Sequence, residues 1–217
     1  MNADLFSHIA RTLLDFVFPP SEDECVVRSL SPHELISLMT HRNTDDMHVL
    51  LPYTERRARA CIHETKFHHN KIATELLGVV LYEYLQTLPE GVYLLVPIPI
   101  SAARFRERGY NQVTEVAKAA LSHPRMEHPV GIKPLHITLR EDILRRTRDT
   151  IPQTDLPKEK RPANIIDAFA VRKSDSVEGA HVLLLDDVLT TGATMHEARE
   201  ALKKLKPASI TCLALAH

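Results

Sequence analysis

Apolar residues follow two spacings along the chain, one typical of helices and one typical of buried strands. Apolar positions recur every three to four residues in segments 5–17, 58–84 (as one or two helices), 113–121 and 194–204. Three strand-length segments, 92–96, 181–185 and 209–215, are almost continuously apolar. Because strands alternate with helices, the pattern predicts an α/β fold with a largely parallel central sheet flanked by helices.

Two segments lack a clear period. Residues 21–52 are acidic, and only Ser31-Pro32-His33-Glu34 has the composition of a helix start. Residues 122–163 are polar and contain six of the fourteen prolines, so we expect mainly loops there. We therefore predict a short helical N-terminal extension, residues 1–52, followed by one α/β domain, residues 53–217.

Charge and cysteine content narrow the class of protein. The net charge of the 217 residues is −1, and residues 1–52 hold three basic and eight acidic side chains, which leaves 24 basic and 20 acidic ones. This small excess of basic residues suits a domain that binds a small anion, and it is far from the basic stripe of a nucleic-acid-binding protein.

The three cysteines are widely separated and predict neither a disulfide framework nor a paired-cysteine metal site. Without a basic leader or an apolar run of 18 residues, we expect a cytoplasmic protein with no membrane span.

The segment Val182-Leu183-Leu184-Leu185-Asp186-Asp187-Val188-Leu189-Thr190-Thr191-Gly192-Ala193-Thr194 carries the candidate chemistry. Four apolar residues lead to two adjacent carboxylates at the end of a predicted strand, the edge where open α/β sheets bind ligands. A loop of small and hydroxyl residues follows, and then a helix. Thr194 with Glu197 three residues later predicts a capping box at the start of this helix.

Physically, this loop suits a phosphate group. Free N–H groups at a helix start carry partial positive charge, and hydroxyl side chains add donors. The predicted phosphate-binding residues are Thr190, Thr191, Gly192, Ala193 and Thr194. Asp186 and Asp187 would repel a phosphate, so they suit ribose hydroxyls, a developing positive charge on a sugar carbon, or hydrated Mg²⁺. The alternative is a pair of solvated or capping acids; a P-loop is excluded because the chain has no GxxxxGK[ST] motif.

This segment resembles the phosphoribosyl pyrophosphate (PRPP) signature of type I phosphoribosyltransferases. Further motifs, in the same order, are similar to the ComF family, amidophosphoribosyltransferase-like proteins linked to DNA uptake in competent bacteria. They are Val96-Pro97-Ile98-Pro99-Ile100, then Arg108-Gly109-Tyr110-Asn111-Gln112, then Arg145-Arg146-Thr147 with Thr150, Gln153, Leu156, Arg161, Asn164 and Phe169. The resemblance runs from about residue 14 to residue 217 and implies the type I phosphoribosyltransferase fold.

The resemblance also implies roles for single residues. Asp186 and Asp187 would be the catalytic pair, contacting the ribose and the metal. Pro97, Ile98 and Pro99 would form the turn that presents N–H groups to pyrophosphate, unless they are a plain strand end. Residues 145–161 would be a basic hood over the ligand, with Arg145, Arg146 and Arg161 as binding residues, unless this is a solvated charged loop. No role follows for Lys66 or for the Arg104–Arg108 run.

The function implied is a phosphoribosyltransferase-like protein that binds PRPP and Mg²⁺ and displaces pyrophosphate with an unidentified nucleophile. The alternative is a non-catalytic ribose-phosphate-binding protein that acts through DNA-uptake or replication-restart partners. Members of the family commonly carry a zinc module of paired cysteines after a Phe-Pro-Pro-like turn. Here Phe18-Pro19-Pro20 is followed only by Cys25. Since such a module needs four ligands, we expect no zinc, and direct DNA binding is in doubt.

Overall fold

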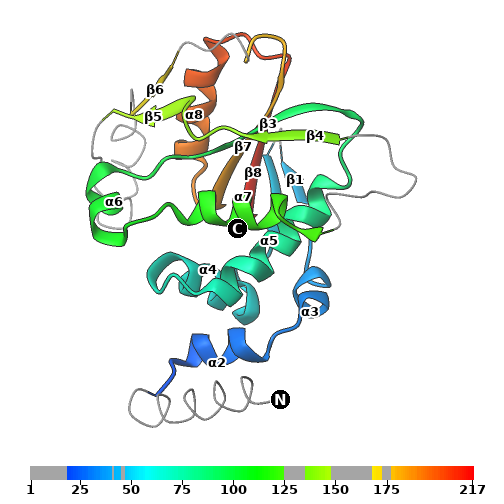
Figure 1. The fold of residues 1–217 in the computed structure, drawn as a ribbon, viewed down its shortest axis with the longest axis vertical. Coiled ribbons are helices and arrows are strands. Elements are labelled where there is room, and N and C mark those ends of the chain that lie inside the picture. Colours follow the sequence, from blue (N-terminus) through cyan, green and yellow to red (C-terminus); the bar gives the residue numbers. More distant parts are fainter. Residues whose placement is uncertain (1–18, 41, 45–46, 125–134, 148–167, 173–176) are drawn as a thin grey trace.

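The fold is described by a computed structural model that covers residues 19–40, 42–44, 47–124, 135–147, 168–172 and 177–217 (Figure 1). Its helices are α2 (Glu22–Ser29), α3 (Pro32–Ile36), α4 (Arg56–Phe67), α5 (Lys71–Leu85), α6 (Ala102–Arg108), α7 (Gln112–Leu121) and α8 (Ala193–Lys203). Its strands are β1 (Arg42–Thr44), β2 (Met47–Leu51), β3 (Gly91–Pro97), β4 (Leu135–Leu139), β5 (Leu144–Arg146), β6 (Phe169–Val171), β7 (His181–Val188) and β8 (Ser209–Ala216).

Six strands form a central sheet in the order β1-β2-β8-β7-β3-β4. Every neighbouring pair in this sheet is parallel except β1 with β2, while β5 and β6 form a separate antiparallel ribbon. β7 lies between β3 and β8, and its Leu185 is in register with Pro97 of β3 and Leu213 of β8. The largely parallel sheet flanked by helices confirms the predicted fold class.

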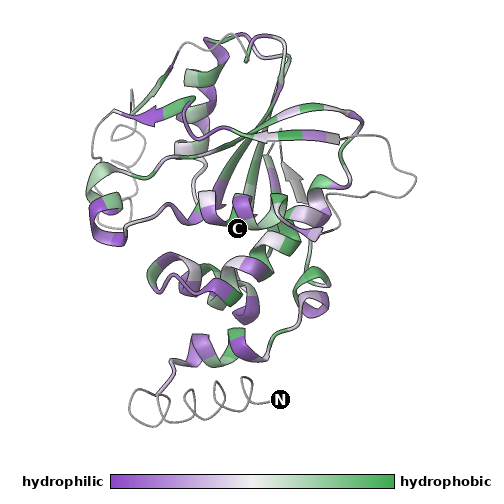
Figure 2. Cartoon of the chain, in the orientation of Figure 1, coloured by the Kyte–Doolittle hydropathy of each residue, from purple (hydrophilic) through white to green (hydrophobic). Residues whose placement is uncertain are grey.

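Helices cover both faces of this sheet. Side chains alternate along a strand, so Leu183 and Leu185 of β7 enter one hydrophobic core while Val182 and Leu184 enter the other. The first core also contains α4, α5 and α7, and the second contains α8 and the β5–β6 ribbon (Figure 1). The central strands are accordingly mostly hydrophobic in Figure 2. Because both faces of these strands are buried, their sequences are continuous runs of apolar residues.

Helices α5 and α7 approach each other closely at Gly78. A Cβ atom at this position would lie 2.7 Å from the Cβ of Ala119 and 3.1 Å from the backbone nitrogen of Ala120. Such distances are too short for a side chain of any size. Glycine therefore allows the two backbones to pack together here.

The predicted extension contributes to the central sheet. A helix does begin at the predicted Ser31–Glu34 start, and Ser31 and Glu34 form a capping box there, with the Ser31 N–H donating to the Glu34 carboxylate at 2.9 Å. The prediction that residues 21–52 are otherwise irregular was wrong, because α2 begins at a Ser21 cap and β2 pairs in parallel with β8. The helix predicted over residues 5–17 lies outside the described residues. Within the described residues, no helix is long and apolar enough to span a bilayer.

Short strands also occupy the proline-rich segment where loops were expected. β4 pairs in parallel with β3, and β5 pairs with β6. These strands have only five and three residues, so their local sequence signal is weak and they depend on pairing with a neighbour. Residues 148–161, most of the predicted hood, lie outside the described residues.

Candidate functional site

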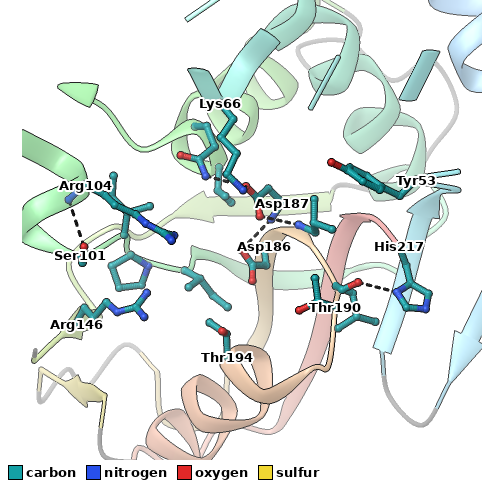
Figure 3. A pocket seen from close by; sticks show the side chains of 17 residues that line it. Tyr53, Lys66, Ser101, Arg104, Arg146, Asp186, Asp187, Thr190, Thr194 and His217 are labelled. Atoms are coloured by element: carbon teal, nitrogen blue, oxygen red, sulfur yellow. Dashed lines mark hydrogen bonds and ion pairs between the residues drawn. The ribbon is translucent and has the colours of Figure 1, made fainter. Parts of the chain in front are cut away.

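A cavity of about 370 Å³ lies at the carboxyl ends of β3 and β7. Parallel strands end at the same edge of a sheet, so the turn after β3 and the aspartate pair of β7 meet there. The cavity is also lined by side chains from α4, α6, α7, α8 and β5 (Figure 3). Segments that are far apart in the sequence thus form one site.

Asp187 is buried, and both of its carboxylate oxygens accept hydrogen bonds. Oδ1 accepts the N–H of Val188 at 2.7 Å. Oδ2 accepts Nε2 of Gln112 at 2.8 Å and lies 3.1 Å from Nζ of Lys66. Burial alone would raise the pKa of Asp187, but the Lys66 ammonium and these hydrogen bonds hold it below its ordinary value. Asp187 is therefore a carboxylate at neutral pH, and its charge is compensated by the protein.

Asp186 lies in a different environment. One of its oxygens accepts the N–H of Asp187 at 2.9 Å, and no donor among the described residues reaches the other oxygen. The carboxyl group points into the cavity in Figure 3. Burial, followed by the negative charge of Asp187, raises the pKa of Asp186 to about 7. The two adjacent carboxyls therefore differ: Asp187 is fixed and charged, while Asp186 titrates near neutrality and faces the ligand space.

The start of α8 is open to a ligand. Gly192 is its N-cap at a φ of 74°, a conformation that favours glycine, and no side chain caps the helix from this position. The predicted capping box of Thr194 and Glu197 was wrong, because α8 already begins at Ala193 and Thr194 is inside the helix. Thr194 instead lines the cavity (Figure 3).

The phosphate-binding residues predicted from the sequence lie in two adjoining spaces. Thr190 and Thr194 line the main cavity. Thr191, Gly192 and Ala193 line a shallower hollow beside it, which Thr190 also borders. The loop thus follows the rim of the cavity.

The turn after β3 is tied firmly to β7. The N–H of Ile98 donates to the carbonyl oxygen of Leu185 at 2.8 Å, and Nδ2 of Asn111 donates to the carbonyl oxygen of Ile98 at 3.0 Å. Pro97 and Pro99 have no N–H. Ile98 and Pro99 line the main cavity, while Pro97 lines a neighbouring hollow. Backbone donors for a ligand can therefore come only from Ile100 onward.

Of the predicted hood arginines, the structure brings Arg146 to the cavity and not Arg145. Arg146 is half-buried, lines the cavity, and has its guanidinium 5.4 Å from the ring of Phe169. Arg145 precedes it in β5 and is exposed, because successive strand residues point to opposite sides. Arg161 lies outside the described residues. Arg104, which had no predicted role, lines the same cavity from α6.

Sequence reasoning also missed the partners of Asp187. Lys66 comes from the last turn of α4 and Gln112 from the first residue of α7. Gln112 is 5% exposed, and its Oε1 accepts a hydrogen bond from Nη1 of Arg108 at 3.2 Å. Gln112 stands in the ComF-like motif quoted above, which was the available signal. Tyr53 and His217 border the cavity on another side, and no sequence motif pointed to either (Figure 3).

A second group of metal-ligand types occurs on α4. Ligand atoms of His63, Glu64 and His68 lie within 4.8 Å of one another. The buried Glu64 accepts hydrogen bonds from Ser21 Oγ at 3.1 Å and from Asn70 Nδ2 at 3.0 Å. Since Ser21 caps α2 and Asn70 caps α5, Glu64 joins two helix starts to α4. This contact accounts for the buried carboxylate in structural terms.

Comparison with known families agrees with the observed fold. The model of the phosphoribosyl transferase domain matches residues 81–217, more than half of the chain. The chain therefore belongs to the phosphoribosyltransferase domain family. Its relatives include competence protein ComFC of Bacillus subtilis, 32% identical over 133 residues, which are 61% of this chain and 48% of that protein. DNA utilization protein YhgH of Escherichia coli is 30% identical over 157 residues, 69% of this chain and 62% of that protein. The predicted ComF-type resemblance is confirmed.

The region that these relatives share with this chain covers about half to three fifths of their own length. Among solved structures, orotate phosphoribosyltransferase of Mycobacterium tuberculosis in complex with PRPP is 13% identical, with 91% of this chain and 76% of that chain covered. Its TM-score is 0.37. The fold assignment rests on the family match and on the strand order.

Proposed function

We propose that the cavity binds PRPP together with Mg²⁺ and that the protein transfers the phosphoribosyl group, releasing pyrophosphate. The observation that carries this proposal is the order of chemically different groups around one cavity. Asp186 and Asp187 lie at its centre, the start of α8 lies on one side, and Arg104 and Arg146 lie on another (Figure 3). PRPP has the same order of parts: a phosphate, a sugar with two hydroxyls, and a pyrophosphate.

The phosphate end of the ligand fits the start of α8. The N–H groups of its first turn have no cap from Gly192, and a helix start favours an anion. Thr190 and Thr194 add hydroxyl donors on the cavity side. We assign the 5-phosphate to this loop.

The centre of the cavity fits the ribose. The second oxygen of Asp186 has no donor within the described part of the chain, and a carboxylate oxygen is a good acceptor for a ribose hydroxyl or a ligand for hydrated Mg²⁺. When bound, Mg²⁺ would supply positive charge that neutralises the pyrophosphate group. The residues present fit such an ion, since Asp186 offers the oxygen type that it prefers.

The pyrophosphate fits the side of the cavity formed by Arg104 and Arg146. Guanidinium groups bind phosphate oxygens with charge-assisted hydrogen bonds. These two arginines would hold the leaving group as its bond to the sugar breaks. The charge of Asp186 would stabilise the positive character that develops on the sugar ring. Catalysis would then depend on positioning and electrostatics, with no protein nucleophile.

A second candidate function is a ribose-phosphate-binding protein that does no chemistry and acts through DNA-uptake or replication-restart partners. The names of the relatives, which refer to competence and DNA utilization, favour it. Release of pyrophosphate from PRPP in the presence of candidate nucleophiles distinguishes the two. The transferase proposal predicts release that depends on an acceptor, Mg²⁺ and Asp186. Tight PRPP binding with no release for any acceptor class would favour the binding protein. For either function, we propose that the protein acts in the cytoplasm.

A further inference from the structure

Asp187 is already paired with a cation that belongs to the protein. Nζ of Lys66 lies 3.1 Å from its Oδ2, and Gln112 donates to the same oxygen at 2.8 Å. The remaining oxygen accepts the N–H of Val188 at 2.7 Å. A metal ion that bound Asp187 would have to displace at least one of these donors.

The donors are held in place by their own neighbours. Arg108 donates to Oε1 of Gln112 at 3.2 Å, which leaves the amide N–H groups of Gln112 to face Asp187. The guanidinium of Arg108 lies 5.1 Å from the centre of the Phe67 ring, and Phe67 directly follows Lys66 at the end of α4. Arg108, Gln112, Asp187 and Lys66 therefore form one connected unit that joins α4, α6, α7 and β7.

The charge at the centre of the cavity follows from this unit. Two carboxylates, Asp186 and Asp187, lie beside one ammonium group, Lys66. The Lys66 side chain is 25% exposed and lines the cavity, so it is accessible from the ligand side. Sites that hold a divalent cation without substrate usually combine several carboxylate oxygens of uncompensated charge. Here the charge of Asp187 is neutralised by Lys66.

We propose that Lys66 is a built-in counter-ion that occupies the position of a divalent cation at Asp187. The free protein then does not hold Mg²⁺ at the aspartate pair, and the ribose-phosphate end of the ligand binds without metal. This inference rests on the proposed function and narrows it: the metal ligand predicted at Asp187 is replaced by Lys66, and Mg²⁺ is required only for ligands that carry a pyrophosphate.

The test uses the full chain and two probes, Mn²⁺ alone and ribose 5-phosphate in the presence of EDTA. Mn²⁺ binding is measured by electron paramagnetic resonance of the free ion, and ribose 5-phosphate binding by calorimetry. Lys66→Met removes the charge and keeps the length of the side chain, and Lys66→Arg keeps the charge. Lys71→Met, at an exposed position on α5, is the matched control.

We expect ribose 5-phosphate binding to need a divalent cation in Lys66→Met and not in the wild type. Lys66→Met should bind Mn²⁺ at least about tenfold more tightly than wild type, because the charge of Asp187 is then uncompensated. Its affinity for ribose 5-phosphate in EDTA should fall at least about tenfold and recover when Mg²⁺ replaces EDTA. Lys66→Arg and Lys71→Met should behave like wild type in both assays.

Several outcomes would overturn the inference. One is equal Mn²⁺ affinity in wild type and Lys66→Met. Another is ribose 5-phosphate binding to wild type that requires Mg²⁺. If Lys66→Met does not fold, Lys66→Gln removes the charge while keeping a donor for Asp187, and the same criteria apply. If wild type binds neither ribose 5-phosphate nor PRPP, the proposed function fails, whereas the Mn²⁺ comparison still decides the role of Lys66.

Discussion

Replacing Asp186 with asparagine is expected to stabilise the ligand-free protein at alkaline pH. Burial and the adjacent Asp187 charge raise the pKa of Asp186 to about 7. Folding therefore makes ionisation of this carboxyl unfavourable, and the folded protein bears that penalty whenever the group is charged. Asparagine has the same shape and keeps an oxygen that can accept the Asp187 N–H, while its side chain does not ionise.

The magnitude and its pH dependence follow from linkage. An unfolded aspartate has a pKa near 3.8, so the rise is about three units, and at 1.36 kcal/mol per unit this corresponds to about 4 kcal/mol. Because Asp186 is open to the cavity on one side, we expect a gain on the order of 2 kcal/mol. A raised carboxyl pKa destabilises the folded state above the folded pKa and not below the unfolded one. The gain should therefore be full at pH 8, smaller at pH 5, and absent below pH 4.

Urea denaturation of both proteins at pH 5 and pH 8 measures this difference. Asp142→Asn is the control, since hydrogen bonds from Arg140 lower the pKa of this exposed carboxyl, and its loss should not stabilise the protein. A variant no more stable than wild type at pH 8 would refute the reasoning. So would a gain of equal size at both pH values, because it would not come from ionisation.

Three further predictions concern the aspartate pair, the core and metal content. Asp187→Asn should weaken PRPP binding at least about tenfold in titration calorimetry, or about 1.4 kcal/mol, because it breaks the ion pair that holds Lys66 and Asp187 in place at the centre of the cavity. Unchanged affinity would make Asp187 purely structural. Gly78→Ala should destabilise the protein by about 1–3 kcal/mol in urea denaturation, because its Cβ would lie 2.7 Å from that of Ala119. The second change Ala119→Gly should recover part of the lost stability, because it removes the contact with the Ala119 Cβ and not the one with the Ala120 backbone, and no recovery would contradict this explanation. The purified protein should contain no stoichiometric zinc by elemental analysis; one zinc per chain would contradict this, with His63, Glu64 and His68 as the first ligands to replace.

The parts of the fold that could be predicted have strong local signals. β3, β7 and β8 are buried on both faces, so each is a run of apolar residues, and α8 shows its buried side at helical spacing. The position of Asp186 at a strand end follows directly from the apolar run before it. By contrast, β2 and β4 are five-residue strands whose partners, β8 and β3, are distant in the sequence.

The candidate site was predictable only in its local part. Asp186, Asp187 and the loop after them are adjacent in the sequence, and one motif identifies them. Gln112 lies 75 positions from Asp187, so no local pattern links the two. Arg146 lines the cavity and Arg145 does not, because only one side of β5 faces the cavity. Only the structure shows which side this is. The division of the chain at residue 52 stays a prediction.

The central claim is that the cavity recognises PRPP, and calorimetric titration of the wild-type protein with PRPP and Mg²⁺ tests it most directly. The account predicts saturable binding at one site per chain, weakened at least about tenfold in Arg146→Ala and in Asp186→Asn. Asp142→Asn, outside the cavity, should bind like wild type. Absence of binding to wild type at millimolar PRPP, or equal binding by all four proteins, would contradict the account.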